Sequence, residues 1–96
     1  MVKREGVKMQ NTKYEIVKLI KKNMQINIEK IDEDIDLFEW GYIDSFDLLN
    51  LIADINEKFN TNIYPDKYER NEINTIRKII NIIMGDIKNY ENNTNC

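Results

Sequence analysis

Three stretches of the chain place apolar residues three and four positions apart, the spacing that gives a helix one buried side. The first stretch covers residues 12–24, the second runs from Asp44 or Ser45 to Phe59, and the third begins after Thr75. We expect each stretch to form an amphipathic helix that packs against the others. The residues expected on the buried sides are Ile16, Val17, Leu19, Ile20, Met24, Leu48, Leu49, Leu51, Ile52, Ile55, Phe59, Ile76, Ile79, Ile80, Ile83 and Ile87.

Local signals predict where these helices begin and end. Thr12, with a glutamate three positions later, has the form of a capping box for the first helix. Asp44 and Thr75 are suited to cap the second and third. The polar residues 60–62 are expected to end the second helix, and Pro65 prevents it from resuming.

The segment between the first two helices has neither a helical nor a strand period. Over residues 26–43, apolar residues are mixed with Asp and Glu, which predicts a long ordered loop held to the core by spaced anchors. Phe38 and Trp40 are the aromatic candidates for such anchors, with docking to a partner as the alternative. Gly41 marks a sharp turn before the second helix.

These elements predict an all-α fold, a four-helix bundle with a long loop between helices 1 and 2 and a short third helix over about residues 66–71. The folded domain is expected to cover residues 12–88. Residues 1–11 and 89–96 lack an apolar period and are expected to form a flexible leader and a flexible tail. Helices this short are unstable alone in water, so their apolar sides must pack together.

The composition excludes several classes of function. A chain of 96 residues without histidine has no Ser-His, Cys-His or His-metal chemistry, and its three scattered glycines form no phosphate-binding loop, so we expect no enzymatic activity. No apolar run reaches the roughly 20 residues that a membrane span requires, which predicts no membrane insertion. The single Cys96 allows no internal disulfide, which favours a cytoplasmic location.

Charge is segregated along the chain. Residues 1–30 carry a net charge of +5, residues 31–66 carry −9 and residues 67–96 carry +1. The acidic centre would repel nucleic acid, so no nucleic-acid partner is expected, and a basic protein partner is favoured. The simpler alternative is that these charges serve solubility. The acids Asp32, Glu33, Asp34 and Asp36 lack the spacing of a calcium-binding loop, so no metal site is predicted.

The chemistry of interest lies at the start of the second helix. Ser45 follows a glycine turn and stands at the first position of an amphipathic helix, where its side chain projects from the end of the bundle. The free amides and the positive end of the helix dipole favour a phosphate group there. The alternative is that Asp44 and Asp47 are ordinary capping residues and Ser45 is merely tolerated beside them. With no base nearby, Ser45 cannot be a nucleophile in its own right.

The run Gly41-Tyr42-Ile43-Asp44-Ser45-Phe46, followed by an apolar and acidic helix, resembles the phosphopantetheine attachment site of acyl carrier proteins. Its Gly-x-x-Asp-Ser spacing is similar to that of the D-alanine carrier proteins, as is the run Tyr68-Glu69-Arg70-Asn71-Glu72-Ile73-Asn74-Thr75 before the last helix. The resemblance covers about residues 12–88. It departs from the acyl-carrier pattern at Phe46, where leucine is usual, and at Asn50, Asn56 and Lys58, where glutamate is frequent.

The resemblance implies that 4′-phosphopantetheine is attached to Ser45 by a phosphopantetheinyl transferase that uses magnesium and coenzyme A. An acyl or aminoacyl group would then be held as a thioester on the thiol of this arm. The other implied partners are an adenylating ligase or other acyl-loading enzyme and an acceptor acyltransferase. The cofactor would carry the chemistry, while the protein, expected to be a monomer, would supply tethering and recognition.

The proposed docking surface consists of residues around and below Ser45 on the same helix. They are Asp44, Phe46, Asp47, Asp54 and Glu57, with simple packing as the alternative for Phe46. Ser45 is expected to lie near Leu48, Leu49 and Ile52, so that an attached chain could fold back between the helices. The alternative function is a small helical protein-interaction module without a prosthetic group. A DNA-binding helix-turn-helix is disfavoured by the acidic centre.

Overall fold

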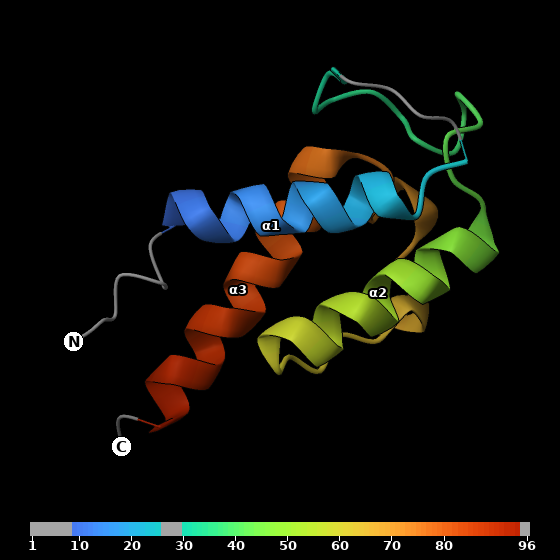
Figure 1. The fold of residues 1–96 in the computed structure, drawn as a ribbon. Helices are drawn as coiled ribbons and strands as arrows, with labels where there is room; N and C mark the ends of the chain where they lie inside the picture. The colour runs from blue at the N-terminus through green and yellow to red at the C-terminus, as the bar shows by residue number, and fades with distance from the viewer. Residues whose placement is uncertain (1–8, 26–29, 95–96) are drawn as a thin grey trace.

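In the computed structural model, which describes residues 9–25 and 30–94, three α-helices surround one apolar core, and none of these residues lies in a strand. The helices are α1 (Met9–Lys22), α2 (Ser45–Phe59) and α3 (Ile76–Thr94). Helix α1 contacts both α2 and α3 and crosses the first turns of α3 (Figure 1). The predicted all-α class is therefore correct for the described part of the chain.

The core consists mainly of isoleucines. Each helix contributes residues spaced three or four apart, as the apolar pattern predicted, and the connecting segments add Leu37, Ile43, Ile63 and Ile73. Leu49 contradicts its predicted burial, since its side chain is 54% exposed. Trp40 is 62% exposed, so it does not anchor the loop to the core, and its docking to a partner stays a prediction. The helical contributions to the core are Ile16, Ile20, Leu48, Leu51, Ile52, Ile55, Ile76, Ile79, Ile80 and Ile83.

The predicted helix caps are correct for two helices and wrong for the first. The Thr75 hydroxyl accepts a hydrogen bond from the Lys78 amide at 3.1 Å, as expected for the cap of α3. Asn60 ends α2 in the left-handed conformation, with φ of 58°. Helix α1 begins at Met9 instead, so Thr12 lies within its first turn rather than before it. Several neighbouring polar residues can begin a helix, and the local pattern did not distinguish among them.

The four-helix count is not confirmed. Where one short helix was expected, the chain forms two 3₁₀ turns, η2 (Pro65–Lys67) and η3 (Arg70–Glu72). Tyr68 and Glu69 between them are extended, with ψ of 138° and 160°, which prevents one continuous helix. Helix α3 also continues to Thr94, past the predicted domain end at residue 88. Residues 1–8, 26–29 and 95–96 lie outside the described residues, so the leader, the extreme tail and the continuous loop remain predictions.

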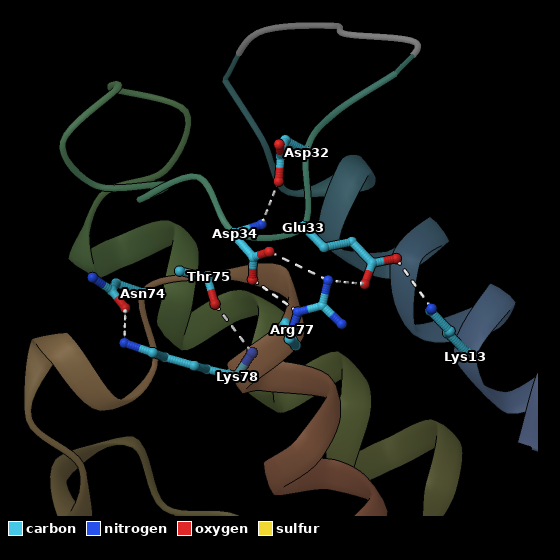
Figure 2. Close-up of polar contacts among 8 residues, drawn as sticks. All are labelled: Lys13, Asp32, Glu33, Asp34, Asn74, Thr75, Arg77 and Lys78. Atoms are coloured by element: carbon cyan, nitrogen blue, oxygen red, sulfur yellow. Dashed lines mark hydrogen bonds and ion pairs between the residues drawn. The ribbon is translucent and has the colours of Figure 1, made fainter.

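The acidic residues before α2 fasten this connecting segment to α1 and α3 (Figure 2). Glu33 pairs with Lys13 of α1 at 3.1 Å and with Arg77 of α3 at 3.7 Å. Asp34 accepts a 2.8 Å hydrogen bond from Arg77 Nε, which lowers the pKa of that carboxyl. The Arg77 amide also donates to the Glu33 carbonyl oxygen at 3.0 Å. These acids thus have a structural role.

The described residues include neither a metal-binding cluster nor a membrane-spanning helix. They contain no cluster of three or more His, Cys, Asp or Glu side chains arranged to hold a metal ion. Within the same residues, no helix has both the length and the hydropathy needed to cross a membrane.

Candidate functional site

The candidate site is the N-terminus of α2, which the preceding segment positions by backbone hydrogen bonds. The Leu37 amide donates to the Asn74 carbonyl oxygen at 2.7 Å, and the Leu37 carbonyl oxygen accepts from Tyr42 at 2.9 Å and Ile43 at 3.3 Å. Gly41 completes this turn with φ of 77°, a conformation that costs glycine little. The fully buried Leu37 side chain holds the turn to the core. The segment that leads into α2 is therefore held both by backbone hydrogen bonds and by a buried side chain.

The Asp36 carboxylate closes the same turn. It accepts hydrogen bonds from the amides of Phe38 and Glu39, both at 3.0 Å, and from the Asn74 side chain at 2.8 Å. The bond from Glu39 makes the largest contribution to lowering the pKa of Asp36. Asp36 was not a predicted site residue, and its position beside Asn74 shows that it orders the turn before the site.

Asp44 and Asp47 form the reciprocal capping box of α2. The Asp47 amide donates to Asp44 Oδ1 at 2.9 Å, and the Asp44 amide donates to Asp47 Oδ2 at 3.1 Å. The hydrogen bond from the Asp47 amide stabilises the ionised form of Asp44 and lowers the pKa of its carboxyl. Asp44 is thus the N-cap that the sequence predicted.

Ser45 is the first residue of α2, and its side chain is exposed. Because the two aspartates make the capping bonds, the Ser45 hydroxyl is not required for capping. It stands where the positive end of the helix dipole favours an attached phosphate. Ser45 is also the only serine in the chain.

The side of α2 that continues from Ser45 into solvent is largely apolar. Phe46 is 69% exposed and Leu49 is 54% exposed. Ala53 and Asn50 are exposed on the same helix, and so is the predicted docking acid Glu57. Leu48 and Ile52, by contrast, are part of the core, so of the three residues expected near Ser45 only Leu49 faces outward.

The predicted docking acids Asp47 and Asp54 are engaged within the protein. Asp47 forms the capping box, and Asp54 accepts a 3.2 Å hydrogen bond from the Asn23 side chain and pairs with Lys22 at 3.6 Å. These partners are the last residue of α1 and the residue directly after it. These two acids thus help to hold α2 in place within the protein.

Gln25 is a residue of the site that the sequence analysis missed. Its side chain lies at the start of α2 and donates to Asp44 Oδ2 at 3.0 Å and to Asp47 Oδ2 at 2.8 Å. Gln25 is an exposed polar residue between the predicted first helix and the segment without a period, and no sequence signal would have pointed to this contact.

Comparison with known proteins bears directly on this helix. A family model described as "Phosphopantetheine attachment site" matches residues 15–83, which include all of α2. The D-alanyl carrier protein of Bacillus velezensis is 30% identical over 69 residues, covering 72% of this chain and 88% of that protein. That of Staphylococcus saprophyticus is 29% identical with the same coverage. The acyl carrier protein of Buchnera aphidicola is 33% identical over 75 residues, covering 78% of this chain and 92% of its own.

Proposed function

Because the chain belongs to the family of carrier proteins with a phosphopantetheine attachment site, we propose that Ser45 is the residue that bears the arm. The cofactor of this family is 4′-phosphopantetheine, and its members are carriers rather than enzymes. The observation that supports Ser45 is its exposed place as the first residue of α2. The arm's thiol supplies the chemistry, since it can hold an acyl or aminoacyl group as a thioester.

The residues present fit the attachment of such an arm. The Ser45 oxygen would form a bond to the phosphorus next to the pantetheine of coenzyme A. The phosphoanhydride bond would break, releasing 3′,5′-ADP, and the hydroxyl proton would pass to the transferase or to water. The product is a phosphodiester, whose negative charge the N-terminal amides of α2 favour. Asp44 would hold the start of the helix through its capping bonds.

We propose that the group carried on the arm is an acyl or aminoacyl group, and the similarity to D-alanyl carrier proteins favours an aminoacyl group. The partners we propose are a phosphopantetheinyl transferase, an adenylating ligase or other loading enzyme, and an acceptor acyltransferase. We place these encounters in the cytoplasm, with residues 12–88 acting as a monomeric carrier domain. The four-helix bundle of acyl carrier proteins remains our proposed description of its architecture.

We propose that partners dock on the exposed side of α2. Phe46 and Leu49 lie within one turn of Ser45, so an enzyme that reaches the Ser45 hydroxyl must approach both side chains. Glu57 adds an exposed negative charge two turns further on. Asp47 and Asp54 belong to the same proposed surface, although their contacts with Gln25, Asn23 and Lys22 leave them less available than Glu57.

The attachment is tested by incubating the purified protein with coenzyme A, magnesium and a broad-specificity phosphopantetheinyl transferase. Intact mass is measured before and after, with Ser45→Ala as the control and circular dichroism to establish that the control is folded. We expect a gain of one phosphopantetheinyl group in the wild type alone. No gain in the folded wild type would contradict the proposal and favour a helical interaction module without a prosthetic group.

Docking is tested with variants that spare the core. Phe46→Ala and Leu49→Ala should each raise KM for arm attachment, because both side chains are more than half exposed in the free protein and would be covered in the complex. Tyr14→Ala is the matched control, since Tyr14 is 63% exposed but lies on α1. Equal effects at all three positions would refute the proposed surface. Glu57→Lys should slow attachment at low salt more than at high salt.

A further inference from the structure

The side chain of Gln25, just past the end of α1, joins the two carboxylates at the start of α2. Its Nε2 lies 3.0 Å from Asp44 Oδ2 and 2.8 Å from Asp47 Oδ2. The Gln25 backbone amide also donates to the Tyr42 carbonyl oxygen at 2.8 Å. Gln25 therefore contacts the chain on both sides of Ser45.

The chemistry of these groups fixes how the amide must be oriented. Ionised carboxylates only accept hydrogen bonds, so Gln25 must present its NH₂ group, and each carboxylate receives one of its two hydrogens. The same Asp47 oxygen also accepts the Asp44 amide, and the other Asp44 oxygen accepts the Asp47 amide. The negatively charged carboxylates of Asp44 and Asp47 are thus joined by hydrogen bonds to one neutral amide group. A donor here offsets their repulsion without adding a charge of its own.

We propose that Gln25 is a positioning residue for the attachment of the arm to Ser45, an inference that rests on the function proposed above. Ser45 directly follows Asp44, so holding Asp44 and the Tyr42 backbone against the end of α1 sets the position of the serine. The phosphodiester on Ser45 would bring a third negative charge beside Asp44 and Asp47. The two donated hydrogens therefore stabilise the modified protein more than the unmodified one.

Three substitutions separate donation from simple packing. Gln25→Ala removes both donors, Gln25→Glu replaces them with a third carboxylate, and Gln25→Lys restores donors. Asn81→Ala and Asn81→Glu are the matched controls, because Asn81 is exposed on α3.

The first readout is backbone amide exchange at Asp47 and Leu48 in the unmodified protein. Gln25→Ala should accelerate it about 3- to 10-fold, the effect of losing one or two solvent-exposed hydrogen bonds. Gln25→Glu should accelerate it more than Gln25→Ala does, relative to Asn81→Glu, because it places a third carboxylate beside Asp44 and Asp47 instead of only removing the donors. Gln25→Lys should exchange within about twofold of the wild type, since each lost hydrogen bond is replaced.

The second readout is the kinetics of arm attachment. Gln25→Ala should raise KM and leave kcat unchanged, because only the fraction of molecules with an ordered α2 start binds productively. No mass gain in the wild type contradicts the proposed function itself. If the wild type gains the arm but Gln25→Ala has the same KM and the same amide exchange rates as Asn81→Ala, the role of Gln25 is overturned and the proposed function still stands.

Discussion

Truncating Leu37 should destabilise the protein far more than truncating the larger Trp40, although the two residues lie three apart in the same segment. The Leu37 side chain is fully buried, whereas that of Trp40 is 62% exposed. Replacing a buried leucine by alanine costs about 2–5 kcal/mol, and an exposed substitution changes stability by about 0.5 kcal/mol or less. Domains of this size are stable by only about 5–15 kcal/mol, so Leu37→Ala removes a large share of the total.

The effect is large enough to measure by urea and thermal unfolding followed by circular dichroism at 222 nm. This helical signal does not depend on the single tryptophan, so it can be used for Trp40→Ala as well. Taking about 3 kcal/mol for Leu37→Ala, the melting temperature should fall by about 12–24 °C, against a few degrees for Trp40→Ala. A comparable loss of unfolding free energy in the two variants would refute the assignment of Leu37, and not Trp40, as the anchor of the segment before Ser45.

Three further predictions concern individual residues. The lowered pKa of Asp44 contributes stability above the unfolded value of 3.8, and this contribution is lost as pH falls through the folded value. Urea titrations below that pH should therefore show a weaker pH dependence for Asp44→Asn than for the wild type. Gly41→Ala should lower the unfolding free energy by about 1–2 kcal/mol, because Gly41 has a φ of 77° that alanine adopts only with strain. Gly85→Ala within α3 should instead raise it by about 0.4–1 kcal/mol. Melting temperatures that shift in the same direction for both variants would contradict this. Asn56→Ala removes the bonds to Thr61 and Ile63 that follow α2 and should cost about 1–3 kcal/mol by urea unfolding.

The helices and most of the core could be predicted because apolar spacing records which side of a helix is buried. The predicted burial of Leu49 was wrong because a leucine at the edge of the apolar side fits the helical spacing whether it faces the core or solvent. The prediction that Trp40 anchors the loop was wrong because the sequence of an irregular segment does not indicate which way an isolated aromatic ring points. The single short helix predicted after Pro65 was wrong because Tyr68 and Glu69 adopt extended backbone, which no residue pattern in this stretch indicated.

The candidate site was only partly predictable. The Asp44 cap and the exposed Ser45 follow from a local pattern and were found. The contacts of Gln25 with Asp44 and of Lys22 with Asp54 join residues far apart in the sequence, and polar pairs of this kind leave no periodic signal. The sequence therefore indicated which residues form the start of α2 but not how the end of α1 holds it.

Whether the lone serine of this chain carries the arm can be read from one tryptic fragment. Cleavage after Lys30 and Lys58 releases residues 31–58, which contain Ser45 and no threonine. After treatment with transferase and coenzyme A, tandem mass spectrometry should locate the phosphopantetheinyl group on this fragment, at Ser45. A folded protein that yields the fragment unmodified, or that carries the group on any other fragment, would contradict the account.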